Sequence, residues 1–258
     1  MHNSVAHSVS KVPEITLAFW FTKILATTLG ETGGDAVSMS MDLGYLVSTG
    51  IFAVIFFIAV GAQISAKRYN PALYWTTIIA TTTVGTTLAD FADRSLGMGY
   101  AGGSTLLFLL LMGSFLVWYK FQGNIATSDI SSSRTEMFYW ITIMFSQTLG
   151  TALGDWVADD GGFGYTGSMV LFGGILLAIV ATYLLTRVSR TLLFWAAFII
   201  TRPLGAVVGD FLDKPLGKGG LELSRYSASA ALLAAIALLV YLSTLKNKTV
   251  IQQELDPE

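Results

Sequence analysis

The chain of 258 residues contains no cysteine, which excludes disulfide bonds and metal sites built on thiolates. It has only two histidines, His2 and His7, and both lie close to the N-terminus. Charged residues make up 12% of the sequence, about half the share found in a typical soluble domain. The net charge of -2 leaves no basic excess for a polyanion. We therefore expect no nucleic-acid partner.

Long apolar segments are abundant instead. Hydrophobic residues make up 53% of the sequence, and the mean hydropathy is +0.63. A helix needs about 20 mainly apolar residues to cross a bilayer. Eight segments approach this length, so the predicted fold class is an all-α membrane protein with eight transmembrane helices in the lipid bilayer. The predicted spans are 15–34, 44–66, 73–91, 100–121, 137–157, 165–187, 191–212 and 224–245.

One spacing recurs four times along the chain. Each copy has a tryptophan, a glycine ten residues later and an aspartate five residues after that: Trp20, Gly30 and Asp35; Trp75, Gly85 and Asp90; Trp140, Gly150 and Asp155; Trp195, Gly205 and Asp210. Each copy holds two predicted spans, so the four repeats run parallel rather than inverted. The predicted organisation is an N-terminal tail (1–14), repeat 1 (15–69), repeat 2 (70–122), a cytoplasmic linker (123–136), repeat 3 (137–189), repeat 4 (190–245) and a C-terminal tail (246–258).

The distribution of lysine and arginine predicts the orientation of the spans. The tails and the segments between repeats hold nine of these residues, whereas the loops within repeats hold four. Because cytoplasmic loops carry the excess of basic residues, both termini are predicted to be cytoplasmic. The aspartate ends of the odd-numbered spans then face outward.

Polar residues form a stripe on each odd-numbered span. Positions three, seven, eleven and fifteen residues after the tryptophan stay near one face of a helix. The even-numbered spans have no comparable stripe. We therefore expect the odd helices to line an interior and the even helices to shield them from lipid. The stripes are Lys23, Thr27, Glu31 and Asp35; Ile78, Thr82, Thr86 and Asp90; Ile143, Gln147, Thr151 and Asp155; Phe198, Arg202, Ala206 and Asp210.

Small residues and tryptophans have structural interpretations. Each odd span has two small residues four apart, such as Gly30 and Gly34, which is typical of close helix contacts. Each repeated tryptophan lies near the predicted cytoplasmic end of its span beside a second aromatic residue, so we expect it to belong to an interfacial aromatic belt.

The four aspartates have two interpretations. At about 1.5 Å per residue, each lies roughly 22 Å beyond its tryptophan, in the outer third of the membrane or at its outer interface. They either form an ion site or cap helices and meet Arg94 and Lys214. The stripes hold five acids against two bases, a surplus of three negative charges that favours a cation or protons. Secondary acids follow the repeated aspartates: Asp93, Asp159, Asp160 and Asp213.

The two bases of the stripes, Lys23 and Arg202, need partners within a bilayer. Glu31 is the nearest acid on the same face as Lys23, and Asp210 lies two turns from Arg202. Either these residues form buried ion pairs that fix helix register, or a cation or proton competes with the two bases for the carboxylates and they act as a gate. The sequence leaves both interpretations open.

Several motifs resemble a known family. They are Phe138-Tyr-Trp-Ile-Thr-Ile, Thr148-Leu-Gly-Thr-Ala-Leu-Gly-Asp-Trp156, Phe194-Trp-Ala-Ala-Phe and the segment from Thr201 to Pro215. From about residue 15 to 245, the chain is similar to bacterial integral membrane proteins built from four tandem copies of a two-span repeat of unknown function. The resemblance implies an eight-span protein of the bacterial inner membrane. It implies no activity.

The function expected from the residues is that of a secondary transporter or exporter of an inorganic cation, coupled to protons. Carboxylate oxygens suit hard ions such as Mn²⁺, Mg²⁺ or Ca²⁺. No cofactor is expected besides a bound divalent cation, and the oligomeric state stays open. The expected metal ligands are Asp35, Asp90, Asp155 and Asp210, with further binding residues Glu31, Thr27, Thr82, Thr86, Gln147, Thr148 and Thr151.

Two other functional classes would leave different signatures in the sequence. A sensor or accessory subunit would bind a ligand without moving it, and its polar stripes would stop short of the cytoplasmic face, as Ile78, Ile143 and Phe198 suggest. An enzyme is not expected, because the sequence has no nucleophile elbow, no metal motif of histidine and glutamate and no glycine-rich phosphate loop.

Overall fold

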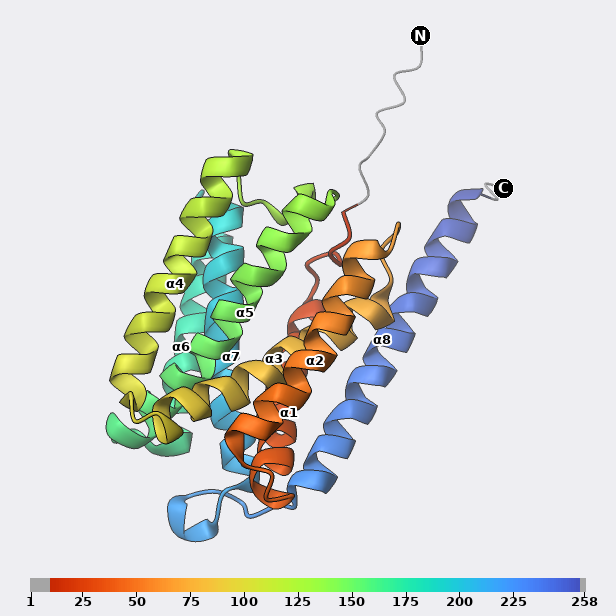
Figure 1. Cartoon of the computed structure of the whole chain (residues 1–258). Helices are drawn as coiled ribbons and strands as arrows, with labels where there is room; N and C mark the ends of the chain where they lie inside the picture. Colours follow the sequence, from red (N-terminus) through yellow and green to blue (C-terminus); the bar gives the residue numbers. More distant parts are fainter. Residues whose placement is uncertain (1–9, 256–258) are drawn as a thin grey trace.

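The computed structural model describes residues 10–255, with the side chains of all of them except Asp129 and 246–255. Within this range the protein contains α-helices, short π and 3₁₀ turns and no strand, which confirms the all-α fold class (Figure 1). The helices are α1 (Leu17–Asp35), α2 (Gly44–Ser65), α3 (Pro71–Asp90), α4 (Gly99–Gln122), α5 (Ser133–Asp155), α6 (Gly164–Leu185), α7 (Arg190–Asp213) and α8 (Arg225–Leu255).

The odd-numbered helices form an inner ring in the order α1, α3, α5, α7 and back to α1. They run in the same direction, so their tryptophans gather at one end, called here the aromatic end, and their aspartates at the other, called here the acidic end. Most of their residues are buried, whereas α2, α4, α6 and α8 expose long apolar surfaces. The layering of odd helices inside and even helices outside therefore agrees with the prediction from the polar stripes.

Each outer helix packs against the inner helix of the following repeat rather than its own. Helix α2 packs on α3, α4 on α5 and α6 on α7, and α8 closes the circle by packing on α1. The two helices of one repeat thus bury their apolar surfaces on different neighbours. This exchange links all four repeats into one bundle.

Five helices of the described chain are long and apolar enough to cross a membrane by their length and composition. These are α2, α4, α6, α7 and the Arg225–Leu245 part of α8. Helices α1, α3 and α5 carry polar stripes of threonines and acids, which lowers their hydropathy. The structure is therefore consistent with a multi-pass membrane protein.

The inner helices begin in a common way. Each has a polar residue at its N-cap whose side chain accepts a hydrogen bond from a backbone N–H of the first turn, as Ser132 does from Thr135 N at 3.2 Å. After the aspartates, α1, α3 and α5 widen into π turns, Ala36–Ser40, Phe91–Ser95 and Trp156–Asp160. Helices α2, α4 and α6 then each begin at a glycine with positive φ, which permits the tight reversal.

Two predicted boundaries differ from the observed ones. Helix α5 already begins at Ser133, so the predicted linker 123–136 is shorter and includes a 3₁₀ turn at Thr127–Asp129. Helix α8 continues to Leu255 through most of the predicted C-terminal tail 246–258. Residues 1–9 of the predicted N-terminal tail, with His2 and His7, and residues 256–258 lie outside the described residues.

The repeated glycines determine how closely the inner helices approach. A Cβ atom on Gly30 would clash with Thr82, on Gly150 with Arg202 and on Gly205 with Thr27, and on Gly85 it would lie 3.2 Å from the Cβ of Gln147. In every case the opposing side chain stands seven residues after the tryptophan of the next inner helix. The glycine of each repeat therefore makes room for a residue of the next polar stripe, and the predicted role in helix packing is supported.

The tryptophans correct one prediction. Trp75, Trp140 and Trp195 are buried, and Trp20 is partly buried. They pack with the aromatic residue that precedes each of them, and the hydroxyl groups of Tyr74 and Tyr139 are hydrogen-bonded at 2.7 Å. The expectation of an interfacial aromatic belt was wrong for these buried rings, because their faces pack against neighbouring inner helices. They close the aromatic end of the ring instead.

Candidate functional site

The four repeated aspartates come together at the acidic end of the ring. Asp35, Asp90, Asp155 and Asp210 are all at most 3% exposed. With Glu31 and Asp213 they form three overlapping groups of three carboxylates, in each of which the nearest oxygens lie within 4.8 Å of one another. The groups are Glu31, Asp35 and Asp90; Glu31, Asp155 and Asp210; and Asp35, Asp210 and Asp213.

Bases from the loops after the inner helices bridge these aspartates in pairs. Lys214 Nζ lies 2.6 Å from Asp35 Oδ2 and 2.9 Å from Asp210 Oδ1. Arg94 lies 3.2 Å from Asp90 Oδ1 and 3.0 Å from Asp155 Oδ2. Repeat 4 is thereby joined to repeat 1, and repeat 2 to repeat 3. The aspartates therefore meet Arg94 and Lys214, as one of the two interpretations of the sequence predicted.

The pairing leaves some carboxylate oxygens without a partner. Asp35 Oδ1, Asp155 Oδ1 and Asp213 Oδ1 are buried and accept no hydrogen bond from any described residue. Arg225 adds a further base at the edge, 2.7 Å from Asp213 Oδ2 and 3.7 Å from Asp35 Oδ2. Buried polar atoms normally have partners, so acceptors without one mark a place where something else can bind.

One turn closer to the aromatic end, Arg202 organises a second polar layer. Its guanidinium group donates to Glu31 Oε2 at 3.2 Å, to Thr86 Oγ1 at 2.6 Å and to Thr151 Oγ1. The three partners come from α1, α3 and α5, so one side chain of α7 connects the whole inner ring. The predicted pairing of Arg202 with Asp210 was wrong, because the guanidinium extends across the ring instead of along its own helix.

Lys23 does not have the predicted partner either. Its Nζ atom is fully buried, has no hydrogen-bond partner among the described residues and lies 3.9 Å from the centroid of the Phe198 ring. Glu31 is bound by Arg202. Residues eight apart on one helix are separated by about 12 Å along the axis, too far for a direct contact.

The remaining predicted residues fall into two groups. Thr27 is used in packing, because its hydroxyl donates to backbone oxygens of α1 and to Thr201 O of α7, and Thr148 likewise donates to Met144 O. Thr82 Oγ1 and both amide atoms of Gln147 are buried without a partner in the described part of the chain. Both side chains lie one helical turn closer to the aromatic end than Glu31 and Thr86, so they continue the polar stripe towards Lys23.

The secondary acids lie at different places. Asp93 packs closely against Gly103 of α4, and burial raises its pKa to about 6. Asp213 binds Arg225. Asp159 accepts a hydrogen bond from Tyr100 at 3.4 Å at the rim of the site, and Asp160 is exposed. The structure thus brings Asp213 into the carboxylate cluster and leaves Asp160 outside it.

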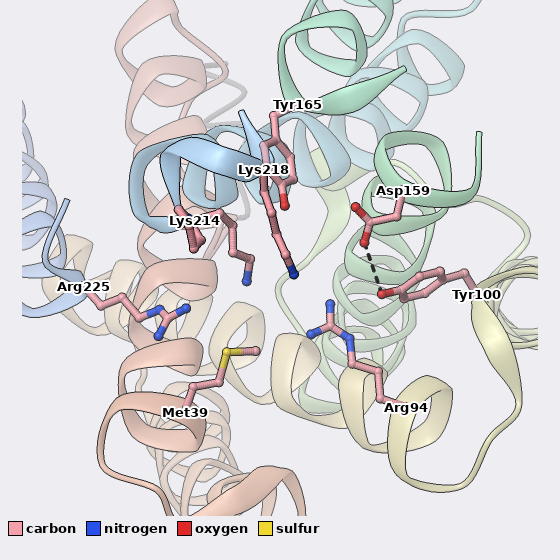
Figure 2. Close-up of a pocket in the computed structure, with 9 residues that line it drawn as sticks. Met39, Arg94, Tyr100, Asp159, Tyr165, Lys214, Lys218 and Arg225 are labelled. Carbon is pink, nitrogen blue, oxygen red and sulfur yellow. Dashed lines mark hydrogen bonds between the residues drawn. The ribbon is translucent and has the colours of Figure 1, made fainter. Parts of the chain in front are cut away.

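A cavity of about 460 Å³ opens above the cluster at the acidic end (Figure 2). Figure 2 shows that Arg94, Lys214, Lys218 and Arg225 extend towards this space from different elements. Burial alone would lower the pKa of Lys214, but the adjacent carboxylates, Asp210 first, outweigh it and raise the pKa well above its ordinary value. Lys214 is therefore a firmly charged ammonium group held between two carboxylates. The cavity is lined by Met39, Arg94, Tyr100, Asp159, Tyr165, Lys214, Pro215, Lys218 and Arg225.

Sequence reasoning did not single out this cavity, although the repeat contains a signal for it. Met39, Arg94, Asp159 and Lys214 all stand nineteen residues after their tryptophan. Tyrosines stand twenty-five residues after the first three tryptophans, and two of them, Tyr100 and Tyr165, line the cavity. Extending the comparison of repeats beyond the aspartates would have found these positions. Arg225 and Lys218 have no such counterpart.

The chain matches a protein-family model described as Repeat of Unknown Function (DUF347). The match occurs four times, at residues 18–69, 73–124, 138–189 and 193–249, each covering most of one inner helix and of the outer helix that follows it. No curated protein and no solved structure matches the chain. The chain therefore belongs to this repeat family and consists of four tandem copies of its repeat.

Proposed function

We propose that this protein is a secondary transporter of an inorganic cation, with a hard divalent ion such as Mn²⁺ as the substrate and protons as the coupling ion. All eight helices would cross the bacterial inner membrane, with both termini in the cytoplasm and the acidic end facing outward. The observation that carries the proposal is the buried cluster of carboxylates on four different inner helices.

The charges of this cluster favour a divalent cation. Six carboxylates take part: Glu31, Asp35, Asp90, Asp155, Asp210 and Asp213. Four bases lie within 4.0 Å of them: Arg94, Arg202, Lys214 and Arg225. Six minus four leaves two negative charges, which one divalent cation would balance. Buried charge without compensation is costly, so the cluster has a physical reason to take up such an ion.

The donor atoms favour a hard ion. All six acids offer carboxylate oxygens, and Thr86 adds a hydroxyl group beside Glu31. Oxygen ligands suit Mn²⁺, Mg²⁺ and Ca²⁺, whereas copper and zinc sites usually contain cysteine or histidine. The chain has no cysteine, and its two histidines lie in the N-terminal tail.

Lys214 and Arg94 give the site a mechanism for exchange. Each already places a positive group between two aspartates from different repeats. An incoming cation would compete with these tethered bases, which would move into the cavity above the cluster. Competition between a fixed base and a mobile cation was expected for Lys23 and Arg202, and the geometry favours Lys214 and Arg94 for this role.

The closed aromatic end fits one state of an alternating-access cycle. The cavity leads to the acidic end, while the tryptophans, Tyr74 and Tyr139 pack together at the other end. A second candidate is a membrane-embedded sensor or accessory subunit that binds a cation without transport. Its supporting observation is the buried layer of Ile78, Ile143 and Phe198, which interrupts the polar stripes.

Ion flux into proteoliposomes tests the proposal. Vesicles that contain a Mn²⁺-sensitive dye should show uptake with the wild-type protein and at most one-tenth of that rate with Asp155→Asn or Asp210→Asn. Asp160→Asn is the matched control, because Asp160 is exposed and outside the cluster. Tight Mn²⁺ binding without flux would favour the sensor, and flux that is unchanged in both cluster variants would refute the proposed site.

A further inference from the structure

Lys23 differs from the other buried bases of the described chain. Lys11 lies 2.5 Å from Glu136, and Arg202 lies 3.2 Å from Glu31. Lys23 is also fully buried, but no carboxylate lies within 4.0 Å of its Nζ atom, and that atom has no hydrogen-bond partner among the described residues. The Nζ atom lies over the face of the Phe198 ring, 3.9 Å from the ring centroid.

The position of Lys23 makes this arrangement unusual. The equivalent residues of the other repeats are Ile78, Ile143 and Phe198, and all three are fully buried. Lys23 therefore contributes the only ionisable group to an apolar layer of the described inner ring. This layer separates the polar stripes from the closed aromatic end.

Few charged or titratable groups face Lys23 from the helices packed against α1. Arg202 is the nearest on α7 and is itself positive. Helix α3 has Tyr74 towards the aromatic end and Asp90 at the acidic end, and α8 has none between Tyr226 and Tyr241. On α1 itself, the acids are Glu31 and Asp35. A charged Lys23 would thus have no acid partner in this conformation.

We propose that Lys23 binds the proton that is exchanged for the cation. The inference rests on the proposed transport function and identifies the coupling site within it. An ammonium group without a partner is costly in an apolar layer, whereas a neutral amine costs much less. Lys23 would therefore be neutral while a cation fills the carboxylate cluster. When the cluster is empty, Lys23 would take up a proton and so compensate one of the two surplus negative charges of the cluster.

The path of the proton follows the polar stripe. Thr82 Oγ1 and the amide of Gln147 lie between Lys23 and the layer of Glu31, and they have no protein partner in the described structure. Water bound to them would connect Lys23 to the acidic end. A proton would add to the Nζ lone pair from that water on one side of the membrane and leave Nζ for water on the other side, with no other bond made or broken.

The test compares proton and cation movement in the same vesicles. With wild-type protein, a pH dye inside the vesicles should report proton movement opposite to Mn²⁺ movement. In Lys23→Met, Mn²⁺ flux down its gradient should stay within threefold of wild type, while the coupled proton movement should fall at least tenfold. Ile78→Met, at the equivalent position of repeat 2, is the matched control and should keep its coupling.

A second variant separates coupling from packing. Lys23→Arg keeps a positive charge but cannot release the proton, so it should slow Mn²⁺ exchange at least tenfold. If wild-type vesicles take up no Mn²⁺, the proposed function fails and this inference fails with it. If Mn²⁺ uptake occurs and Lys23→Met retains the wild-type proton coupling, only the inference is overturned, and a carboxylate must carry the proton.

Discussion

The two ends of the inner ring use the same four helices for different purposes. At the acidic end, Lys214 joins aspartates of repeats 4 and 1, and Arg94 joins those of repeats 2 and 3. At the aromatic end, the tyrosine pair Tyr74 and Tyr139 also joins repeats 2 and 3, while repeats 4 and 1 meet through Phe194 and Phe19. The four inner helices thus repeat the same arrangement around the ring, whereas their side-chain contacts join the repeats in two pairs.

The difference between the ends lies in the kind of polar group that each buries. The hydroxyl groups of Tyr74 and Tyr139 bind each other, and apolar rings surround them. The acidic end keeps buried carboxylate oxygens without partners beneath an open cavity. The packed aromatic end stabilises the bundle, whereas the acidic end, with its unpaired carboxylate oxygens, is poised to bind. Variants at each end test this contrast.

The largest effect is expected where the two ends connect, at Arg202. Arg202→Met leaves Glu31 buried without its base, which should lower the free energy of unfolding by about 3–5 kcal/mol. Unfolding of the detergent-purified protein by denaturant measures this change. The double variant with Glu31→Gln should recover most of the loss, since it no longer leaves a buried charge. A single variant as stable as wild type would show that the pair does not hold the ring together.

A smaller loss is expected from the glycine layer between the ends. Gly150→Val places a side chain against Arg202, and overpacking of this kind costs about 1–3 kcal/mol. Gly174→Val is the control, because a side chain there meets open space. Thermal unfolding of both variants checks the difference. Equal losses at the two sites would contradict the explanation of the Trp-to-Gly spacing.

The aromatic end should affect stability without affecting binding. Tyr139→Phe removes the hydrogen bond to Tyr74, which should cost about 1 kcal/mol. Mn²⁺ affinity, measured by titration calorimetry, should stay within twofold of wild type, whereas Asp210→Asn should weaken it at least tenfold. A loss of affinity in Tyr139→Phe comparable to that in Asp210→Asn would remove the functional distinction between the ends.

The smallest effect concerns pH and two equivalent acids. Asp93 and Asp213 both stand eighteen residues after their tryptophan, but only Asp213 binds Arg225. The pKa of Asp93 is raised to about 6 in the folded protein, so the fold favours the protonated form of this side chain. This stabilisation is fully present below the pKa of Asp93 in the unfolded chain and is lost as the pH rises through 6. At pH 7, Asp93→Asn should therefore unfold at a higher temperature than wild type, with a gain of about 1 kcal/mol or less in the free energy of unfolding. At pH 4 it should show no such gain.

Asp213 is buried like Asp93, but its ion pair with Arg225 should decide the sign of the change. Asp213→Asn loses its ion pair with Arg225 and should unfold at lower temperature than wild type at pH 7. Thermal scans of both variants at pH 4, 5.5 and 7 provide the comparison. Stabilisation by Asp213→Asn, or destabilisation by Asp93→Asn at pH 7, would contradict the assignment of their partners.

The sequence predicted the layers of the bundle and the meeting of the four aspartates. Both follow from periodicity, because residues at steps of four share a face and lipid excludes polar faces. The eight predicted spans correspond to the eight α-helices within a few residues at most ends.

The contacts between helices could not be predicted in the same way. A periodic pattern shows which face of a helix is polar but not which neighbour it meets. Lys23 was therefore paired with an acid on its own helix, although Arg202 occupies that acid from across the ring. The tryptophans were assigned to an interfacial belt for the same reason, because composition at a helix end does not distinguish a ring at the membrane interface from one packed on another helix.

Mn²⁺ binding to the detergent-purified protein tests the central claim most directly. Electron paramagnetic resonance distinguishes free from bound Mn²⁺ and gives the number of bound ions per chain. We predict one tightly bound ion in the wild-type protein and none in a folded variant in which Asp35, Asp90, Asp155 and Asp210 are all replaced by asparagine. Equal binding by the two proteins, or no binding by the wild type, would contradict a cation site at the acidic end.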